Sequence, residues 1–115
     1  MRQLLRGKIH RAVVTDANVD YVGSITVDSD LLAKADIWAG ERVLVSDVNN
    51  GARFETYTVL GEAGSGTVCV NGAAARLVKP GDLVIIMAFE YTDKPITPRI
   101  VLVDEKNRPV DMHQA

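Results

Sequence analysis

The apolar residues of this chain recur at every second position or in brief continuous runs, which is the pattern of β-strands rather than of long helices. Gly, Pro, Asn and Asp separate the runs, as turn residues do between strands. The runs predict strands over residues 8–14, 21–27, 42–48, 52–60, 67–71, 83–89 and 99–103. Many short strands with little helix, in a chain of 115 residues, predict a mainly β domain closed into a small barrel.

Turn residues between the strands predict specific loops. Asn49-Asn50-Gly51 predicts a tight hairpin, because Asn and Gly tolerate positive φ. Pro80 and Gly81 stand at the central positions of a type II turn. Gly64-Ser65-Gly66 is interpreted as a relaxed hairpin tip, and residues 16–20 as a turn-rich connector.

Two short helices are also expected. Asp28 or Ser29 can cap a helix over residues 30–35, where apolar residues recur at helical spacing. The segment Asn71-Gly72-Ala73-Ala74-Ala75 predicts a turn into a second short helix. Consecutive backbone N–H groups at such a turn can converge on an anion.

Three segments allow predictions of exposure. Residues 83–89 are almost continuously apolar, so this strand is expected to be buried on both faces. Residues 105–115 are expected to form a polar tail. Alternation over residues 8–14 puts Ile9, Arg11 and Val13 on one face of a strand, and on the other face Lys8, His10, Ala12 and Val14.

Composition and charge narrow the class of protein. The chain is one domain of 12.5 kDa with a net charge of -2 and a pI near 5.6, which argues against nucleic acid as a partner because phosphate binding needs a concentrated basic surface. Neither a signal peptide nor an apolar run of about 18 residues occurs, which predicts a soluble, cytoplasmic protein with no membrane partner. The single cysteine, Cys69, excludes an internal disulfide and is interpreted as a small buried hydrophobe.

Strand geometry suggests two polar pairs. Lys8 and His10 are two residues apart and share one face, with their side chains roughly 7 Å apart. Arg53 and Tyr57 also share a face, while Thr56 points to the other. Each pair could line a ligand site or could belong to an ordinary solvated strand.

Metal and nucleotide sites are not indicated. His10 and His113 are the only histidines, and no second cysteine is available to complete a metal site. His113 is expected to be solvated in the tail. Glycine-rich phosphate-binding loops are absent from the sequence.

The dipeptide Gly23-Ser24 stands inside the apolar, strand-like run of residues 21–27, where a loop dipeptide is not expected. In the simplest interpretation it marks a β-bulge. In the alternative, a strained backbone lets the Ser24 Oγ attack the adjacent Gly23 carbonyl, and the chain cleaves itself.

Several segments together resemble the pyruvoyl-dependent aspartate 1-decarboxylases. The resemblance is collinear over residues 1–104 and is carried by Lys8-Ile9-His10-Arg11, Tyr21-Val22-Gly23-Ser24, Asn50-Gly51-Ala52-Arg53, Thr56-Tyr57 and Asn71-Gly72-Ala73-Ala74-Ala75. It implies a double-psi β-barrel with short helices, assembled as a homotetramer with active sites between subunits.

The resemblance also implies self-processing of the single domain, residues 1–115, into a β chain of residues 1–23 and an α chain of residues 24–115. Ser24 Oγ would attack the Gly23 carbonyl, and β-elimination and hydrolysis would leave a covalent pyruvoyl group at position 24. Thr56 resembles the family threonine that promotes this cleavage, and a maturation factor is a possible partner.

The substrate implied by the resemblance is L-aspartate, which would form an imine with the pyruvoyl group, lose its α-carboxylate as CO2 and leave β-alanine for pantothenate synthesis. Arg53 and Lys8 would bind the two carboxylates, and Tyr57 would donate the proton. The pocket would be completed by His10, Tyr21, Asn71, Gly72, Ala73 and Ala74.

Three positions depart from the family pattern. Arg76 stands where relatives often carry His, Ser46 where some carry a large aromatic residue, and Ile25 is a milder change. These departures concern pocket shape and rate more than reaction class. The competing hypothesis is a non-catalytic barrel that binds an anionic small molecule.

Overall fold

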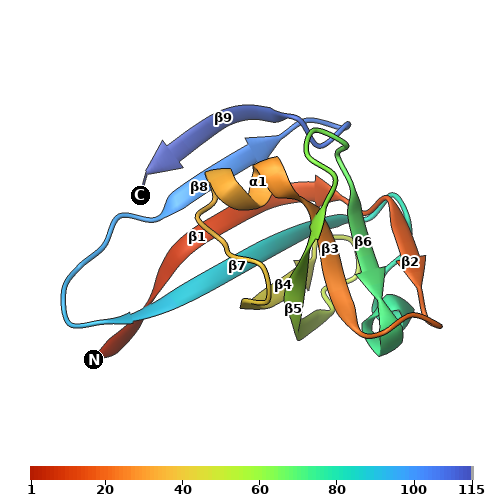
Figure 1. The fold of residues 1–115 in the computed structure, drawn as a ribbon, viewed down its shortest axis with the longest axis horizontal. Helices are drawn as coiled ribbons and strands as arrows, with labels where there is room; N and C mark the ends of the chain where they lie inside the picture. The colour runs from red at the N-terminus through yellow and green to blue at the C-terminus, as the bar shows by residue number, and fades with distance from the viewer. Residues whose placement is uncertain (115) are drawn as a thin grey trace.

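The structure, a computed structural model, describes the backbone of residues 1–114 and the side chains of residues 1–110. The described chain is mainly β, as predicted, and Figure 1 shows its strands together with the short helix α1. Its elements in chain order are β1 (Arg2–Val13), β2 (Asp16–Asn18), β3 (Ser24–Asp28), α1 (Ser29–Lys34), β4 (Arg42–Asp47), β5 (Arg53–Gly61), β6 (Val68–Asn71), the 3-10 helix η1 (Gly72–Leu77), β7 (Leu83–Thr92), β8 (Arg99–Val103) and β9 (Pro109–Gln114).

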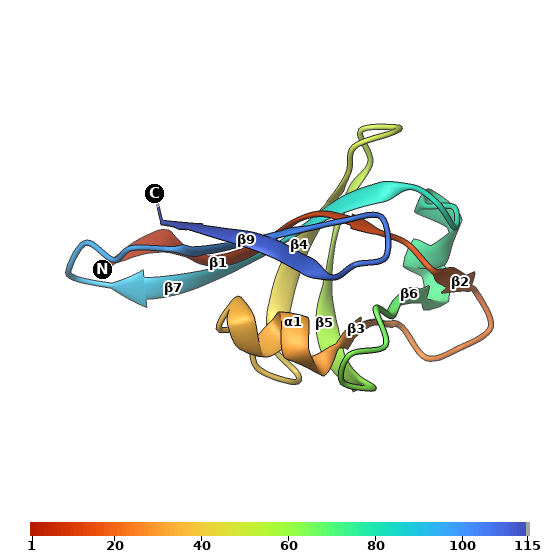
Figure 2. The ribbon, with the colours of Figure 1, turned by 90° about the horizontal axis from the view of Figure 1, so that it is seen from above.

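The strands hydrogen-bond in the order β2-β6-β3-β5-β4-β7-β1-β8-β9. Just after β1, the Thr15 N–H donates to the Val68 carbonyl at 2.8 Å, and the Val68 N–H donates to Thr15 Oγ1 at 2.9 Å. These bonds close a barrel in the order β1-β7-β4-β5-β3-β6, because they join its first and last strands. In Figure 2, β1, β7 and β9 extend together beyond the barrel, toward the end that carries both termini.

Most strand pairs are antiparallel, with parallel pairs at β3–β5, β2–β6 and β1–β8. Parallel neighbours require crossover connections, so the chain crosses the barrel instead of running up and down it. This closed, crossed arrangement agrees with the double-psi barrel that the resemblance implies.

The barrel interior is filled by aliphatic side chains that alternate along the strands. Ile25 and Val27 of β3 and Val68 and Val70 of β6 are fully buried. Burying an aliphatic side chain of this size stabilises the fold by about 1.5–3 kcal/mol. The inward residues therefore set which face of each strand is turned outward, toward the candidate site.

The predicted alternation along the first strand is wrong after His10. Arg11 has a φ of 62°, and the pairing of β1 with β7 shifts register between Ile9 and Ala12. This bulge inserts an extra residue, so Ala12 and Val14 are buried on the same side as Ile9. Lys8 and His10, which precede the shift, remain opposite Ile9 as predicted.

The strand over residues 83–89 is not buried on both faces. In β7, Val84, Ile86 and Ala88 are fully buried, while the residues between them are only half-buried. A barrel strand has one face in the core and one outside, so the apolar run reflects two different environments.

Two strands and the first half of another were not predicted. Residues 2–7 extend β1, residues 16–18 form β2 instead of a connector, and residues 109–114 form β9 instead of a tail. β2 and β9 lie at the two edges of the sheet, where backbone hydrogen bonds to one neighbour are enough to hold them. The side chain of His113 lies outside the described residues.

The segment Gly64-Ser65-Gly66 is not a hairpin tip, because β3 lies between β5 and β6. The Gly64 and Gly66 N–H groups donate to the Asp28 carboxylate at 3.0 and 2.8 Å. Asp28 also caps α1 by accepting from the Asp30 N–H at 2.8 Å, as predicted. Burial of Asp28 opposes its ionisation, but the donors from Gly66, Asp30 and Gly64 outweigh it and lower the pKa.

The turn predictions at Asn49-Asn50-Gly51 and Pro80-Gly81 are confirmed. Gly51 has a φ of 78° in the hairpin between β4 and β5, and Gly81 has a φ of 95°. The Asp82 N–H donates to the Lys79 carbonyl at 2.9 Å, which closes the predicted type II turn. None of the helices within residues 1–114 has the length and apolar character needed to cross a membrane.

Candidate functional site

The dipeptide Gly23-Ser24 lies at the start of a strand, not inside one. β3 begins at Ser24, and residues 19–23 form the preceding loop. Ser24 is only 2% exposed. None of residues 21–24 has a positive φ. The strained backbone considered for the dipeptide is therefore not seen as a left-handed conformation at any of these residues. The feature that remains is a buried hydroxyl where a loop becomes a strand.

Asn71 holds the Ser24 hydroxyl from the neighbouring strand. The two residues are direct partners in the antiparallel pair of β3 and β6. Asn71 Nδ2 donates to Ser24 Oγ at 3.0 Å and to Thr26 Oγ1 at 3.2 Å, and Ser24 Oγ is 3.5 Å from the Val22 carbonyl oxygen. Asn71 is itself 3% exposed. The serine oxygen therefore accepts a hydrogen bond in a site that excludes most water.

Gly72 packs directly against Gly23. With a φ of 77° it begins η1, and a Cβ at this position would lie 2.6 Å from Gly23 Cα and 2.9 Å from Gly23 N. Only glycine fits both the conformation and the space. The predicted turn into a short helix at Asn71-Gly72 is thus confirmed, and it brings the loop before Ser24 against the start of η1.

The remaining residues predicted for this end of the barrel lie at its surface. Tyr21 is 60% exposed in the loop before Gly23. Ala73 is exposed, and Ala74 is half-buried against the core. Arg76 is exposed in η1.

β5 runs beside β3 and carries the predicted catalytic pair. The parallel register places Thr58 opposite Ile25, so Thr56 and Tyr57 lie next to the start of β3. Tyr57 and Arg53 are exposed, whereas Thr56 is half-buried on the other face, as the alternation predicted. Ser46 of β4 pairs with Arg53, so this departure from the family pattern lies beside the predicted substrate arginine.

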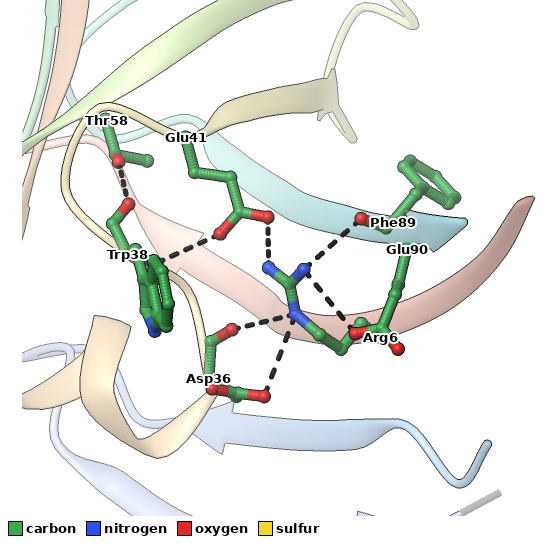
Figure 3. Close-up of polar contacts among 7 residues, drawn as sticks. All are labelled: Arg6, Asp36, Trp38, Glu41, Thr58, Phe89 and Glu90. Atoms are coloured by element: carbon green, nitrogen blue, oxygen red, sulfur yellow. Dashed lines mark hydrogen bonds and ion pairs between the residues drawn. The ribbon is translucent and has the colours of Figure 1, made fainter. Parts of the chain in front are cut away.

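Thr58 is anchored by a loop that the half-buried Arg6 holds in place (Figure 3). The Thr58 hydroxyl donates to the Trp38 carbonyl at 2.6 Å, and the Thr58 N–H donates to the Glu41 carbonyl at 3.1 Å. Arg6 forms an ion pair with Glu41 and donates to the Asp36 carbonyl at 3.0 Å. This loop therefore ties β5, at the residue that pairs with β3, to β1.

A cavity of about 490 Å³ adjoins this arginine and includes none of the predicted site residues. It is lined by Arg6, Asp36, Trp38, Ala39, Gly40, Glu41 and Glu90. A hollow of about 520 Å³ also includes none of the predicted site residues, and it is lined by Gln3, Glu41, Arg42, Val43, Leu44, Glu55, Phe89 and Tyr91. Cavity size therefore does not single out the predicted site residues.

Within one chain, Lys8 and His10 do not lie next to Ser24. Lys8 pairs with Met87, Met87 with Leu44 and Leu44 with Glu55, so Lys8 lies three strand steps from β5, roughly 14 Å. Along β1, Lys8 lies seven residues before Thr15, the residue that meets β6, which is roughly 20 Å. Within one chain, Lys8 therefore does not lie beside Arg53 or beside the start of β3.

His10 lines a separate hollow of about 400 Å³, together with Leu83, Leu102 and Val110. Its Nδ1 is buried and has no hydrogen-bond partner among the described residues. Burial, together with the positive charges of Lys8 and Arg11, lowers the pKa of His10. The imidazole that lines this hollow therefore favours its neutral form.

Cys69 is half-buried and makes a polar contact that the sequence did not indicate. Its Sγ donates to Asn71 Oδ1 at 3.2 Å. Burial and the nearby Asp16 carboxylate raise the pKa of the thiol, so it is held as S–H. Within the part of the chain that the structure describes, no group of three or more His, Cys, Asp and Glu could hold a metal ion.

Thr26 is the residue of the site that sequence reasoning missed. It stands two positions after Ser24, so the period of a strand puts both hydroxyls on one face. That signal was present in the sequence, but its meaning depends on Asn71, which reaches both hydroxyls from another strand.

Comparison with known proteins gives consistent matches. A family model described as aspartate decarboxylase matches residues 1–110. An aspartate 1-decarboxylase of Acetivibrio thermocellus is 57% identical over 113 residues, covering 95% of this chain and 90% of the relative. An aspartate 1-decarboxylase of Thermoanaerobacter pseudethanolicus is 52% identical over 115 residues, covering 96% of this chain and 98% of the relative.

Among solved structures, the computationally designed msDPBB_sym2 protein matches with a TM-score of 0.46 and 20% identity. The match covers 74% of this chain and 96% of that chain.

Proposed function

Since this chain belongs to the aspartate decarboxylase family, it converts L-aspartate to β-alanine and CO2, and we propose that it does so with a pyruvoyl group made from its own Ser24. The observation that carries the proposal is the buried Ser24 Oγ, which accepts from Asn71 and lies next to Gly23. In this proposal the β-alanine serves pantothenate synthesis.

The residues around Ser24 fit a covalent group at this position. Because residue 72 is a glycine, no side chain lies between the start of η1 and Gly23. The end of the 1–23 fragment can therefore lie there after cleavage. Ser24 is almost completely buried, which would keep water away from a reactive carbonyl. When present, the pyruvoyl group supplies an electron sink for the charge left by the departing carboxylate.

The proposed cleavage uses groups of this chain. Ser24 Oγ attacks the Gly23 carbonyl carbon, and the peptide bond becomes an ester. Asn71 holds the attacking oxygen in place, and Thr56 lies on β5 beside the start of β3. We assign to Thr56 a hydrogen bond to the Gly23 carbonyl during cleavage, because this half-buried hydroxyl is close to the loop that ends at Gly23.

Substrate binding is assigned to both sides of an interface between subunits. Arg53 can bind one carboxylate of aspartate through a bidentate pair, and Lys8 can bind the other. Because Lys8 lies about three strand steps from β5 in its own chain, the Lys8 of each site would come from a neighbouring subunit. A homotetramer with sites between subunits satisfies this requirement.

The other assignments follow from the same placement. Tyr57 is exposed beside the start of β3 and would donate the proton that forms β-alanine. Tyr21, Gly72, Ala73 and Ala74 would line the pocket from one subunit, and His10 from its neighbour. A cytoplasmic location and a maturation factor remain predictions from the sequence.

Intact-mass measurement tests the proposal. Protein purified and incubated alone should resolve into fragments 1–23 and 24–115, and the larger should lack a free amine and react with carbonyl reagents. Release of CO2 from aspartate should rise in step with the cleaved fraction. Decarboxylation by a chain that stays whole would overturn the assignment of Ser24, while leaving the reaction unchanged.

A further inference from the structure

Four polar side chains occupy neighbouring positions on one outer face of β3 and β6. The register pairs Ser24 with Asn71 and Thr26 with Cys69. The intervening residues of both strands face the core, so these four point the same way. Ser24 and Asn71 are buried, whereas Thr26 and Cys69 are half-buried.

The Asn71 amide joins the other three. Its Nδ2 donates to Ser24 Oγ at 3.0 Å and to Thr26 Oγ1 at 3.2 Å, while its Oδ1 accepts from Cys69 Sγ at 3.2 Å. A side-chain amide has a donor end and an acceptor end. The thiol is a weak donor and a weak acceptor, and here its S–H donates to the amide oxygen, which turns the NH2 toward Ser24.

We propose that Thr26 and Cys69 are positioning residues for self-cleavage, because they hold the Asn71 amide with its N–H directed at Ser24 Oγ. The inference rests on the proposed cleavage at Gly23–Ser24. Neither residue touches the scissile bond, so both act through Asn71.

The geometry assigns this donor mainly to the second step of cleavage. In the first step Oγ bonds to the Gly23 carbonyl carbon, its proton passes to a base, the C–N bond breaks, and the Ser24 nitrogen is protonated. A hydrogen bond donated to Oγ makes it a weaker nucleophile, so this step gains little.

In the second step a base removes the Ser24 Cα proton and the Cβ–Oγ bond breaks. Oγ then leaves as one oxygen of the Gly23 carboxylate, and dehydroalanine remains. The oxygen that accepts from Asn71 is the one that gains negative charge, so a donor held at this position stabilises the transition state. Loss of that donor geometry should make the ester accumulate.

The ester has the same mass as the precursor, but hydroxylamine cuts it after Gly23. The masses of the fragments separate this cut from cleavage at the Asn50-Gly51 and Asn71-Gly72 bonds, which hydroxylamine also attacks. We expect the double variant Thr26→Val with Cys69→Ala to form the pyruvoyl-bearing fragment roughly 10-fold more slowly, as for a weakened charge-stabilising donor. During this delay a hydroxylamine-sensitive chain should build up. The single variants Thr26→Ser and Cys69→Ser keep a donor or acceptor and should process at nearly the wild-type rate.

Thr92→Val is the matched control, because this hydroxyl donates to the Lys94 carbonyl at the end of β7 and is remote from Asn71. Wild-type rates in the double variant would overturn the inference, as would slow processing without hydroxylamine-sensitive chain. If both single serine variants processed as slowly as the double variant, the slow processing would be due to lost packing and not to lost hydrogen bonds. If the wild-type chain itself never cleaves, the proposed function fails instead.

Discussion

Gly72 and Gly23 touch through their backbones, and a Cβ on Gly72 would lie 2.6 Å from Gly23 Cα. The two glycines are far apart in sequence but meet because β3 and β6 pair at Ser24 and Asn71. The contact fixes the position of the proposed scissile bond relative to the Asn71 donor. It also allows a test that separates the strain of a left-handed alanine from the steric clash with Gly23.

Replacement of Gly72 by alanine should block self-cleavage. Gly72→Ala adds both a left-handed non-glycine residue, worth about 1 kcal/mol, and a steric clash with Gly23. Gly51→Ala is the matched control, because Gly51 has a similar φ of 78° but a Cβ there meets nothing within 4 Å. Intact mass should show a whole Gly72→Ala chain and a cleaved Gly51→Ala chain. Equal cleavage of both variants would show that the Gly72–Gly23 contact does not matter.

Ser24→Ala should leave the 12.5 kDa chain whole and without decarboxylase activity, since no hydroxyl remains to form the ester. The other Gly-Ser dipeptide of the chain supplies the control. Ser65 lies in an exposed loop, so Ser65→Ala should be cleaved after Gly23 like the wild type. Mass spectrometry and CO2 release measure both effects. Cleaved, active Ser24→Ala protein would contradict the proposed origin of the pyruvoyl group.

Arg53→Ala should still cleave itself but should lose substrate binding. A charge-assisted pair with a carboxylate contributes about 2–3 kcal/mol, so kcat/KM for aspartate should fall by about 100-fold. Arg108→Ala, at an exposed arginine in the turn between β8 and β9, should leave kcat/KM unchanged. An Arg53→Ala enzyme with wild-type kcat/KM would remove Arg53 from the substrate site.

Lys8→Ala and Arg53→Ala should complement each other if each site takes these residues from different subunits. Each variant alone should be nearly inactive. After the two are mixed, dissociated and reassembled, random assortment should restore about one quarter of the wild-type activity, because that fraction of interfaces carries both native residues. Wild-type protein treated in the same way is the control for recovery. Mixed tetramers without regained activity would contradict a shared site.

Asp28 should make the fold sensitive to acid. Its pKa is lowered in the folded protein, so its contribution to stability is present above the unfolded pKa of about 4 and is lost as the pH falls through the lower folded pKa. At pH 7, Asp28→Asn should reduce the free energy of unfolding by about 2 kcal/mol. It should also flatten the loss of stability below about pH 4.

Urea unfolding at fixed protein concentration and several pH values measures this effect, because assembly shifts apparent stability. Asp20→Asn, at an exposed aspartate in the loop before Gly23, is the control and should change neither quantity. An Asp28→Asn protein with an unchanged pH profile would mean that the Gly64 and Gly66 donors do not stabilise the charged carboxylate.

Local signals in the sequence predicted the features that depend on a few adjacent residues. The Asn49-Asn50-Gly51 hairpin, the turn at Pro80-Gly81 and the Asp28 cap of α1 all form as expected. Each depends on a backbone conformation or a hydrogen bond within a few residues, so chain composition is sufficient to specify it. The bulge at Arg11 escaped prediction because strict alternation assumes an uninterrupted strand.

The sequence by itself determined a mainly β chain, its turns, and the motif residues that resemble a decarboxylase. Only the tertiary structure decided that Ser24 meets an amide 47 residues away in Asn71, and that Lys8 lies apart from Arg53. The physical reason is register: the pairing of β3 with β6 is set when the core residues of both strands are buried together. That condition involves the whole barrel, and no short stretch of sequence contains it.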